Sequence, residues 1–187
     1  MKTLVIHPTD PTTNFLKLVY KGQDCTVIND IVSKAALKKA IKEHDRIIML
    51  GHGTADGLLV ASTPSGGGWD TGMFSSVRMV LDSTLVYLLK EKKNSVFVWC
   101  YAKEFVEKYE LNGFATGMIV SEPVEALFLS LPEDEKPILE SNILFTDCLR
   151  KSIYLDPLLI LPTMQALYQA DNNAIVNFNK QNLYYFK

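Results

Sequence analysis

Short apolar runs punctuate the first two thirds of the chain, and stretches with helical spacing separate them. The runs are apolar at nearly every position and lack the in-and-out alternation of a half-exposed strand. That pattern is typical of parallel strands that are buried on both faces. The predicted strands cover residues 3–6, 25–28, 47–50, 95–99 and 116–120.

Apolar residues between these runs recur with the spacing of amphipathic helices. Val124, Leu127, Phe128 and Leu131 share one face of the helix expected over 122–131. The other predicted helices are a segment after the N-cap Ser33 and residues 14–20, 77–89, 102–109 and, beyond Pro137, segments around 144–149, 163–170 and 174–185. The alternation predicts a three-layer α/β sandwich with a mostly parallel, doubly wound sheet and a helical C-terminal extension.

The length of 187 residues fits one main domain. We expect an α/β domain over residues 1–131 and a helical extension over 132–187 that packs on it or beside it. The acidic, proline-flanked segment "LPEDEKP" at 131–137 separates the two and could act as a hinge.

Composition narrows the range of partners. The chain is 48% hydrophobic and 21% charged, with a net charge of −2, so no basic stripe suggests nucleic acid. Its apolar runs are far shorter than the roughly 20 residues that cross a bilayer. The N-terminus lacks the apolar core of a signal peptide, which predicts a cytoplasmic protein with no membrane partner. Oligomeric state is not predicted.

Cysteine and histidine usage points away from metal sites. The three cysteines, Cys25, Cys100 and Cys148, are widely spaced and odd in number, which argues against a disulfide framework or a structural zinc site. We expect Cys25 and Cys148 to lie in the core, and we expect His7 to cap a turn before a proline and His44 to be structural. Neither a metal nor another cofactor is predicted.

Two reactive side chains follow neighbouring strands. His52, in "GHG" at 51–53, follows the third predicted strand, and Cys100 ends the fourth. In the doubly wound order 2-1-3-4-5 these strands are adjacent, about 4.8 Å apart, so a nucleophile and a base can meet at the carboxyl edge. The backbone N–H groups of Gly53 and Cys100 can point into the same space and form an oxyanion hole.

The segments "RIIMLGHG" and "SVFVWCYA" resemble those of the caspase-like cysteine peptidases (clan CD, which includes caspases, gingipains and CHAT proteins). The histidine precedes the cysteine by 48 residues, close to the roughly 50 of caspases. The segment "TGMIVSEPVEALF" resembles the strand and helix after the catalytic cysteine of CHAT-type members, so the likeness covers residues 1–131.

The resemblance implies that Cys100 is the nucleophile, His52 the base and acid, and a peptide or protein the substrate. It also implies that the Gly53 and Cys100 N–H groups form the oxyanion hole. Two departures limit the comparison. No glycine follows Cys100, and Trp99 stands where metacaspases carry the Asp that selects basic residues. Cleavage preference is therefore not carried over.

Four further residues are candidates for a substrate pocket: Asp56, Trp69, Ser121 and Glu122. Asp56 precedes a glycine, and that pair is also an ordinary turn signal. Trp69 lies in a glycine-rich loop over 62–76, which lacks the features of a phosphate-binding loop. Ser121 is equally suited to cap a helix.

Two other functions compete with the peptidase. The missing glycine after the cysteine and the helical C-terminus favour a catalytically inactive interaction module on the same scaffold. The glycine-rich loop would instead suit a flavodoxin-like domain that binds a small molecule, with a bound flavin as one possible ligand.

Overall fold

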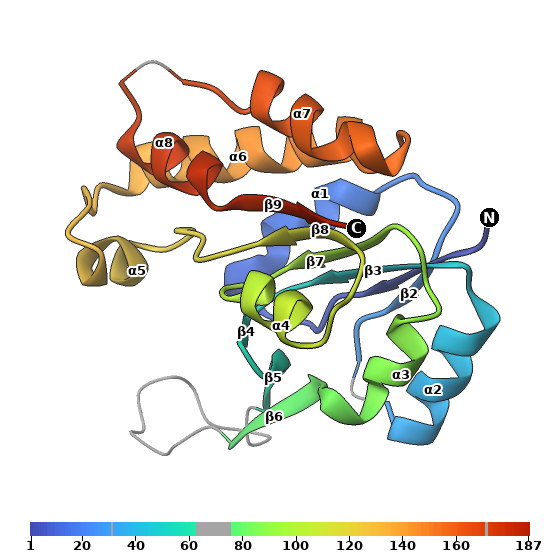
Figure 1. Ribbon diagram of the computed structural model, residues 1–187. Helices are drawn as coiled ribbons and strands as arrows, with labels where there is room; N and C mark the ends of the chain where they lie inside the picture. The colour runs from blue at the N-terminus through green and yellow to red at the C-terminus, as the bar shows by residue number, and fades with distance from the viewer. Residues whose placement is uncertain (31, 63–75, 171) are drawn as a thin grey trace.

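The main feature of the computed structural model, which describes residues 1–30, 32–62, 76–170 and 172–187, is a six-stranded sheet. The strand order is β2-β1-β3-β7-β8-β9 (Figure 1). The first five strands are mutually parallel, and β9 runs antiparallel to β8 at the edge. The bounds are β1 Thr3–Ile6, β2 Thr26–Ile28, β3 Arg46–Leu50, β7 Ser95–Val98, β8 Gly113–Thr116 and β9 Leu183–Phe186. The predicted mostly parallel sheet is confirmed. So is the expected order 2-1-3-4-5 of its parallel strands, which corresponds to β2-β1-β3-β7-β8.

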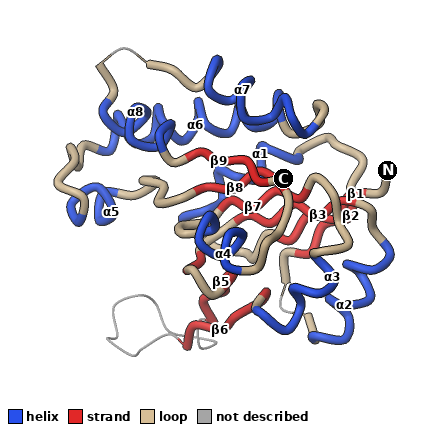
Figure 2. Tube along the Cα trace, in the orientation of Figure 1, coloured by secondary structure: helices blue, strands red, loops and turns tan. Residues whose placement is uncertain are grey.

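Helices cover both faces of this sheet, as Figures 1 and 2 show. Ile47 and Met49 of β3 pack with α2 (Lys34–Glu43), α3 (Val86–Leu89) and α4 (Ala102–Lys108) on one face. Ile48 and Leu50 pack on the other face with α1 (Lys17–Tyr20), α6 (Glu135–Ser152) and α7 (Pro157–Leu167). Alternate residues of one strand thus enter different cores, which explains why the strands are apolar throughout.

The C-terminal part of the chain both covers and extends the sheet. Phe145 and Leu149 of α6 share a buried cluster with residues of β3 and β7. Helix α8 (Ala174–Gln181) then ends, and β9 returns to pair with β8. The helix expected over 174–185 is therefore too long, because the β-prone residues "LYYF" at 183–186 complete the sheet edge instead.

A second, three-stranded antiparallel sheet follows β3. It consists of β4 (Gly53–Thr54), β5 (Gly57–Ser62) and β6 (Ser76–Leu81). The helix expected over 77–89 is wrong in its first half, because residues 77–81 pair with β5. Asp82 then caps a 3-10 turn, η3 (Ser83–Leu85), which leads into α3.

Helix α5 (Pro123–Phe128) buries a different face from the one predicted. Val124, Leu127 and Phe128 are 51%, 55% and 82% exposed, whereas Ala126 is buried against α6 and α8. The strand before it is also displaced, since β8 ends at Thr116 and residues 117–122 lead to the helix as irregular chain. Periodicity identified an amphipathic segment here but not the side that faces the core.

Smaller differences concern element ends. The helix expected over 14–20 is a 3-10 helix, η1 (Pro11–Leu16), continued by α1, and Ser33 caps α2 as predicted by accepting from Ala36 N–H. The expected segment at 144–149 falls in α6, whereas the one at 163–170 overlaps only the end of α7, which stops at Leu167. Among the described helices, none combines the length and apolar character that a bilayer crossing requires.

Candidate functional site

Cys100 lies in a fixed turn at the carboxyl edge of the sheet. Strand β7 ends at Val98. The Thr116 hydroxyl of the neighbouring strand then holds the backbone of Trp99, accepting from Trp99 N–H at 3.2 Å and donating to Trp99 O at 2.9 Å. Tyr101, which follows the cysteine, adopts the left-handed conformation with φ 67°. That strained conformation turns the chain into α4 and leaves Cys100 at the corner.

His52 reaches the same edge from β3. Gly51 N–H donates to Val98 O at 3.0 Å, which keeps the two chains side by side beyond the strand ends. Gly51 has φ 145°, a conformation that favours glycine, and the chain there turns out of the main sheet into β4. The turn delivers the His52 side chain to the end of β7.

The Trp99 side chain contacts the His52 turn through Gly53 and Thr54. Its indole N–H donates to Thr54 O at 3.0 Å, and its ring lies against Gly53. A Cβ at Gly53 would lie 2.1 Å from Trp99 Cδ1, so a larger residue would push β4 away. The Trp99 side chain therefore sets the distance between the His52 turn and the Cys100 turn.

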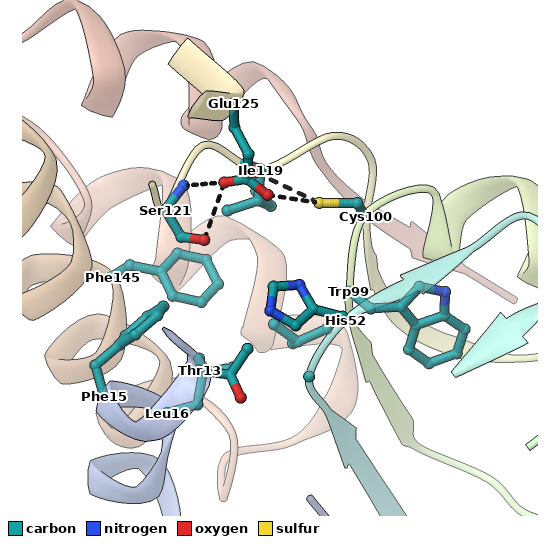
Figure 3. A pocket seen from close by; sticks show the side chains of 12 residues that line it. Thr13, Phe15, Leu16, His52, Trp99, Cys100, Ile119, Ser121, Glu125 and Phe145 are labelled. Atoms are coloured by element: carbon teal, nitrogen blue, oxygen red, sulfur yellow. Dashed lines mark hydrogen bonds between the residues drawn. The ribbon is translucent and has the colours of Figure 1, made fainter. Parts of the chain in front are cut away.

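The His52 and Cys100 side chains point into one small pocket (Figure 3). Its volume is about 30 Å³, room for no more than a few water molecules. Apolar side chains from η1 and α6 form the wall opposite the sheet. The lining residues are Thr13, Phe15, Leu16, Gly51, His52, Val98, Trp99, Cys100, Ile119, Ser121, Glu125 and Phe145.

The Cys100 thiol faces two acceptors. Its Sγ donates to Ile119 O at 3.5 Å and to Glu125 Oε1 at 3.7 Å (Figure 3). Burial raises the pKa of Cys100 to about 12, and the nearby Glu125 carboxylate contributes in the same direction. At neutral pH the thiol is therefore protonated at rest, and the reactive thiolate is scarce.

Glu125 is held firmly in this position. Its Oε2 accepts from Ser121 N–H at 2.7 Å, from the Ser121 hydroxyl at 3.0 Å and from Glu122 N–H at 3.1 Å. Glu122 and Glu125 form the capping box at the start of α5. Burial and then Glu125 raise the pKa of Glu122, whereas His52 acts to lower it, which places all three groups in one electrostatic neighbourhood.

His52 is anchored on its other side by the segment that follows β1. Its Nε2 lies 2.6 Å from Thr12 Oγ1 and 3.8 Å from Asp10 Oδ1. The Thr12 hydroxyl donates to Asp10 Oδ1 at 2.6 Å, and the same oxygen caps η1 by accepting from Thr12 N–H at 2.9 Å. A carboxylate, a hydroxyl and an imidazole thus form one chain of hydrogen bonds.

The backbone N–H groups proposed for an oxyanion are oriented as follows. Leu59 N–H donates to His52 O at 2.8 Å. The next pair along the two strands, Gly53 and Leu58, is therefore a non-hydrogen-bonded pair of the antiparallel ladder. In such a pair the Gly53 N–H points away from β5. Among the described residues, the Cys100 N–H has no protein acceptor. Cys100 lines the pocket, whereas Gly53 is not among its lining residues.

Of the other residues predicted for the pocket, some lie at it and one lies away from it. Ser121 lines the pocket, and Glu122 adjoins it at the start of α5. Asp56 lies in the exposed β4–β5 turn, where it pairs with Lys108 at 3.1 Å, away from the pocket lining. Trp69 and all but the two end residues of the predicted loop over 62–76 lie outside the described residues, and those end residues belong to β5 and β6.

The remaining histidines and cysteines lie elsewhere. His7 is buried and bonded to Tyr20 and Thr13, and His44 bonds to Ala40 O and to a threonine hydroxyl. Cys148, a residue of α6, is buried in the core, whereas Cys25 is half-buried just before β2, at the opposite edge of the sheet. The expectation that Cys25 lies in the core is therefore met only in part, since it packs against the core cluster without being buried in it.

Sequence reasoning missed three residues that contact the reactive pair: Asp10, Thr12 and Glu125. Signals for them existed. "TDPTT" at 9–13 follows β1, whose carboxyl end meets the same edge as β3, and "SEPVE" at 121–125 has the spacing of a capping box.

Comparisons with protein-family models, curated proteins and solved structures find no match to this chain.

Proposed function

We propose that this chain is a caspase-like cysteine peptidase, with Cys100 as the nucleophile and His52 as the general base and acid. The observation that carries the proposal is the pocket shared by the two side chains at the ends of the adjacent strands β3 and β7. A thiol and an imidazole at one carboxyl edge of a parallel sheet are the parts that acyl transfer requires.

The proposed reaction proceeds through a thioester. His52 takes the proton from Cys100 Sγ, and the sulfur attacks the carbonyl carbon of the scissile amide. The resulting oxyanion accepts from Gly53 N–H and Cys100 N–H, and the imidazolium gives its proton to the departing amine as the C–N bond breaks. Water, deprotonated by His52, then attacks the thioester, and the released sulfur recovers its proton.

The resting geometry requires one rearrangement before this reaction. The thiol proton is directed at Ile119 O and Glu125, and the pocket is too small for a peptide carbonyl with its flanking groups. Substrate binding would therefore have to draw Cys100 away from Glu125. Removal of that contact would also lower the pKa of the thiol, since the carboxylate is one cause of its rise.

A second candidate function draws on the same facts. A pocket of only about 30 Å³ and a thiol whose pKa is raised to about 12 also suit an inactive relative that serves as an interaction module. Helix α5 presents three exposed apolar side chains on its outer face, which would suit protein contacts. The two functions differ in whether Cys100 is needed.

The deciding experiment compares wild type, Cys100→Ala and Cys148→Ala with a thiol-directed acyl probe and a mixed peptide library. The peptidase predicts that Cys100→Ala abolishes both labelling and turnover, whereas Cys148→Ala changes neither by more than about twofold. Equal labelling of wild type and Cys100→Ala, with no turnover by either, would leave the interaction module as the better account.

A further inference from the structure

Two hydrogen bonds on the outer side of His52 bear on which of its ring nitrogens carries the proton. The Thr12 hydroxyl has a single hydrogen, and it is directed at Asp10 Oδ1 over 2.6 Å. The same hydroxyl oxygen lies 2.6 Å from His52 Nε2. Because the hydroxyl has already used its hydrogen, it acts as the acceptor in this second bond, and Nε2 is the donor.

The tautomer of the neutral ring follows from this polarity. A neutral imidazole carries one N–H, so a proton on Nε2 leaves Nδ1 with a free lone pair. Figure 3 shows one ring nitrogen of His52 on the side that faces Cys100 and Glu125. Since Nε2 is bonded to Thr12, the nitrogen that faces the pocket is Nδ1.

We propose that Asp10 and Thr12 are positioning residues that hold His52 as the Nε2–H tautomer, with Nδ1 as the base toward Cys100. Their role in catalysis rests on the proposed peptidase function, whereas the tautomer does not. Asp10 has a second effect, because its carboxylate lies 3.8 Å from Nε2 and its side chain is only 12% exposed. An imidazolium formed by proton transfer from the thiol would gain a nearby counter-charge.

The segment that supplies this pair is itself rigid. Asp10 caps η1 through Thr12 N–H, and Pro11 begins the helix with a fixed φ. Thr13, the next residue, turns its hydroxyl toward Nε2 of the other histidine at this edge, His7, at 3.4 Å. Consecutive threonines thus contact different histidines. The Thr13 hydroxyl also donates to Asp10 O at 3.4 Å, so Thr13→Val is a control for the His52 tautomer alone.

The test reads the tautomer directly by ¹⁵N NMR on protein labelled at histidine, at about pH 8, where an ordinary imidazole is neutral. His52→Gln assigns the signals. Wild type is expected to show His52 with Nε2 protonated, and Thr12→Val to shift His52 toward the other tautomer. Thr12→Ser is expected to retain the wild-type pattern, and Thr13→Val to leave the His52 signals unchanged.

A second readout measures the rate at which the thiol probe labels Cys100. We expect Thr12→Val to slow labelling about tenfold or more and Thr12→Ser, which keeps the hydroxyl, to label at the wild-type rate. Asp10→Asn, which keeps an acceptor but removes the charge, should slow it severalfold. Unchanged labelling in Thr12→Val would show that Thr12 does not position His52 for catalysis. Unchanged labelling in Asp10→Asn would show that the Asp10 charge plays no part in it.

The two readouts separate failure of this inference from failure of the peptidase. A wild-type His52 protonated on Nδ1, or a tautomer indifferent to Thr12→Val, overturns the inference whatever the enzyme does. If the chain cleaves nothing and Cys100 does not label, the NMR result alone still decides the tautomer.

Discussion

His7 and His52 follow adjacent parallel strands, β1 and β3, and each bonds through Nε2 to a threonine of η1. Their exposure and their nearest neighbours differ. His7 is 1% exposed and contacts Tyr20, and burial, then the charge of Lys17, lowers its pKa to about 4. His52 has a 34% exposed side chain, a carboxylate 3.8 Å away and a thiol in the same pocket. The position at the sheet edge is shared, so neighbours and water determine which histidine can serve as a base.

The largest expected difference between the two histidines is in activity. His52→Gln should lower peptide turnover by about 10²–10⁴-fold, because the general base is lost. His7→Gln should lower it far less, since His7 does not line the pocket. The measurement is kcat/KM on a cleaved library peptide, with the folded state of each variant checked by circular dichroism. Equal losses in both variants would erase the proposed distinction.

The next difference concerns stability against pH. The folded-state pKa of His7 is about 4, below the ordinary 6.5, so the unfolded chain binds the proton more tightly. Stability due to neutral His7 is therefore fully present above about pH 6.5, falls as pH decreases and is lost by about pH 4. The difference of about 2.5 units corresponds to about 3 kcal/mol.

Urea unfolding between pH 7 and pH 4 measures this effect. Carboxylates also titrate in that range, so the informative quantity is the difference between wild type and His7→Gln. We expect His7→Gln to flatten the pH dependence and His52→Gln to preserve it. A pH dependence that is the same in wild type and His7→Gln would show that His7 is not held neutral.

The smallest expected effect concerns the thiol that faces His52. Glu125→Gln removes a charge that raises the pKa of Cys100, and its amide can donate to Sγ. The pKa should fall, and iodoacetamide labelling of Cys100 at about pH 8 should rise about tenfold. Glu122→Gln is the matched control, because Glu122 acts on the thiol only at longer range and should change labelling less. A fall in labelling in Glu125→Gln would indicate that Glu125 helps to remove the proton.

Much of the fold could be predicted from local pattern. Unbroken apolar runs identified the buried parallel strands β1, β3 and β7, because both of their faces are covered. The order of elements along the chain then placed His52 and Cys100 on adjacent strand ends, and the structure brings their side chains into one pocket.

Prediction from the apolar pattern was wrong where a segment could form either a helix or a strand of a nearby sheet. Residues 77–81 have an apolar content compatible with a helix, but they pair with β5. The residues "LYYF" at 183–186 continued a helical pattern, yet the open edge of β8 accepts them as β9. In α5 the expected core face points outward, because the short helix is held through Ala126 and its capping box.

The amino-acid sequence alone determined the α/β class, the buried strands and the pairing of a histidine with a cysteine at one edge of the sheet. These features follow from local periodicity and from the fixed direction of parallel strands. Only the tertiary structure decided the state of that pair. Asp10 and Thr12 approach His52 from one side, and Glu125 approaches Cys100 from the other. Protonation depends on burial and on charges within a few ångströms, which chain folding sets and sequence spacing does not.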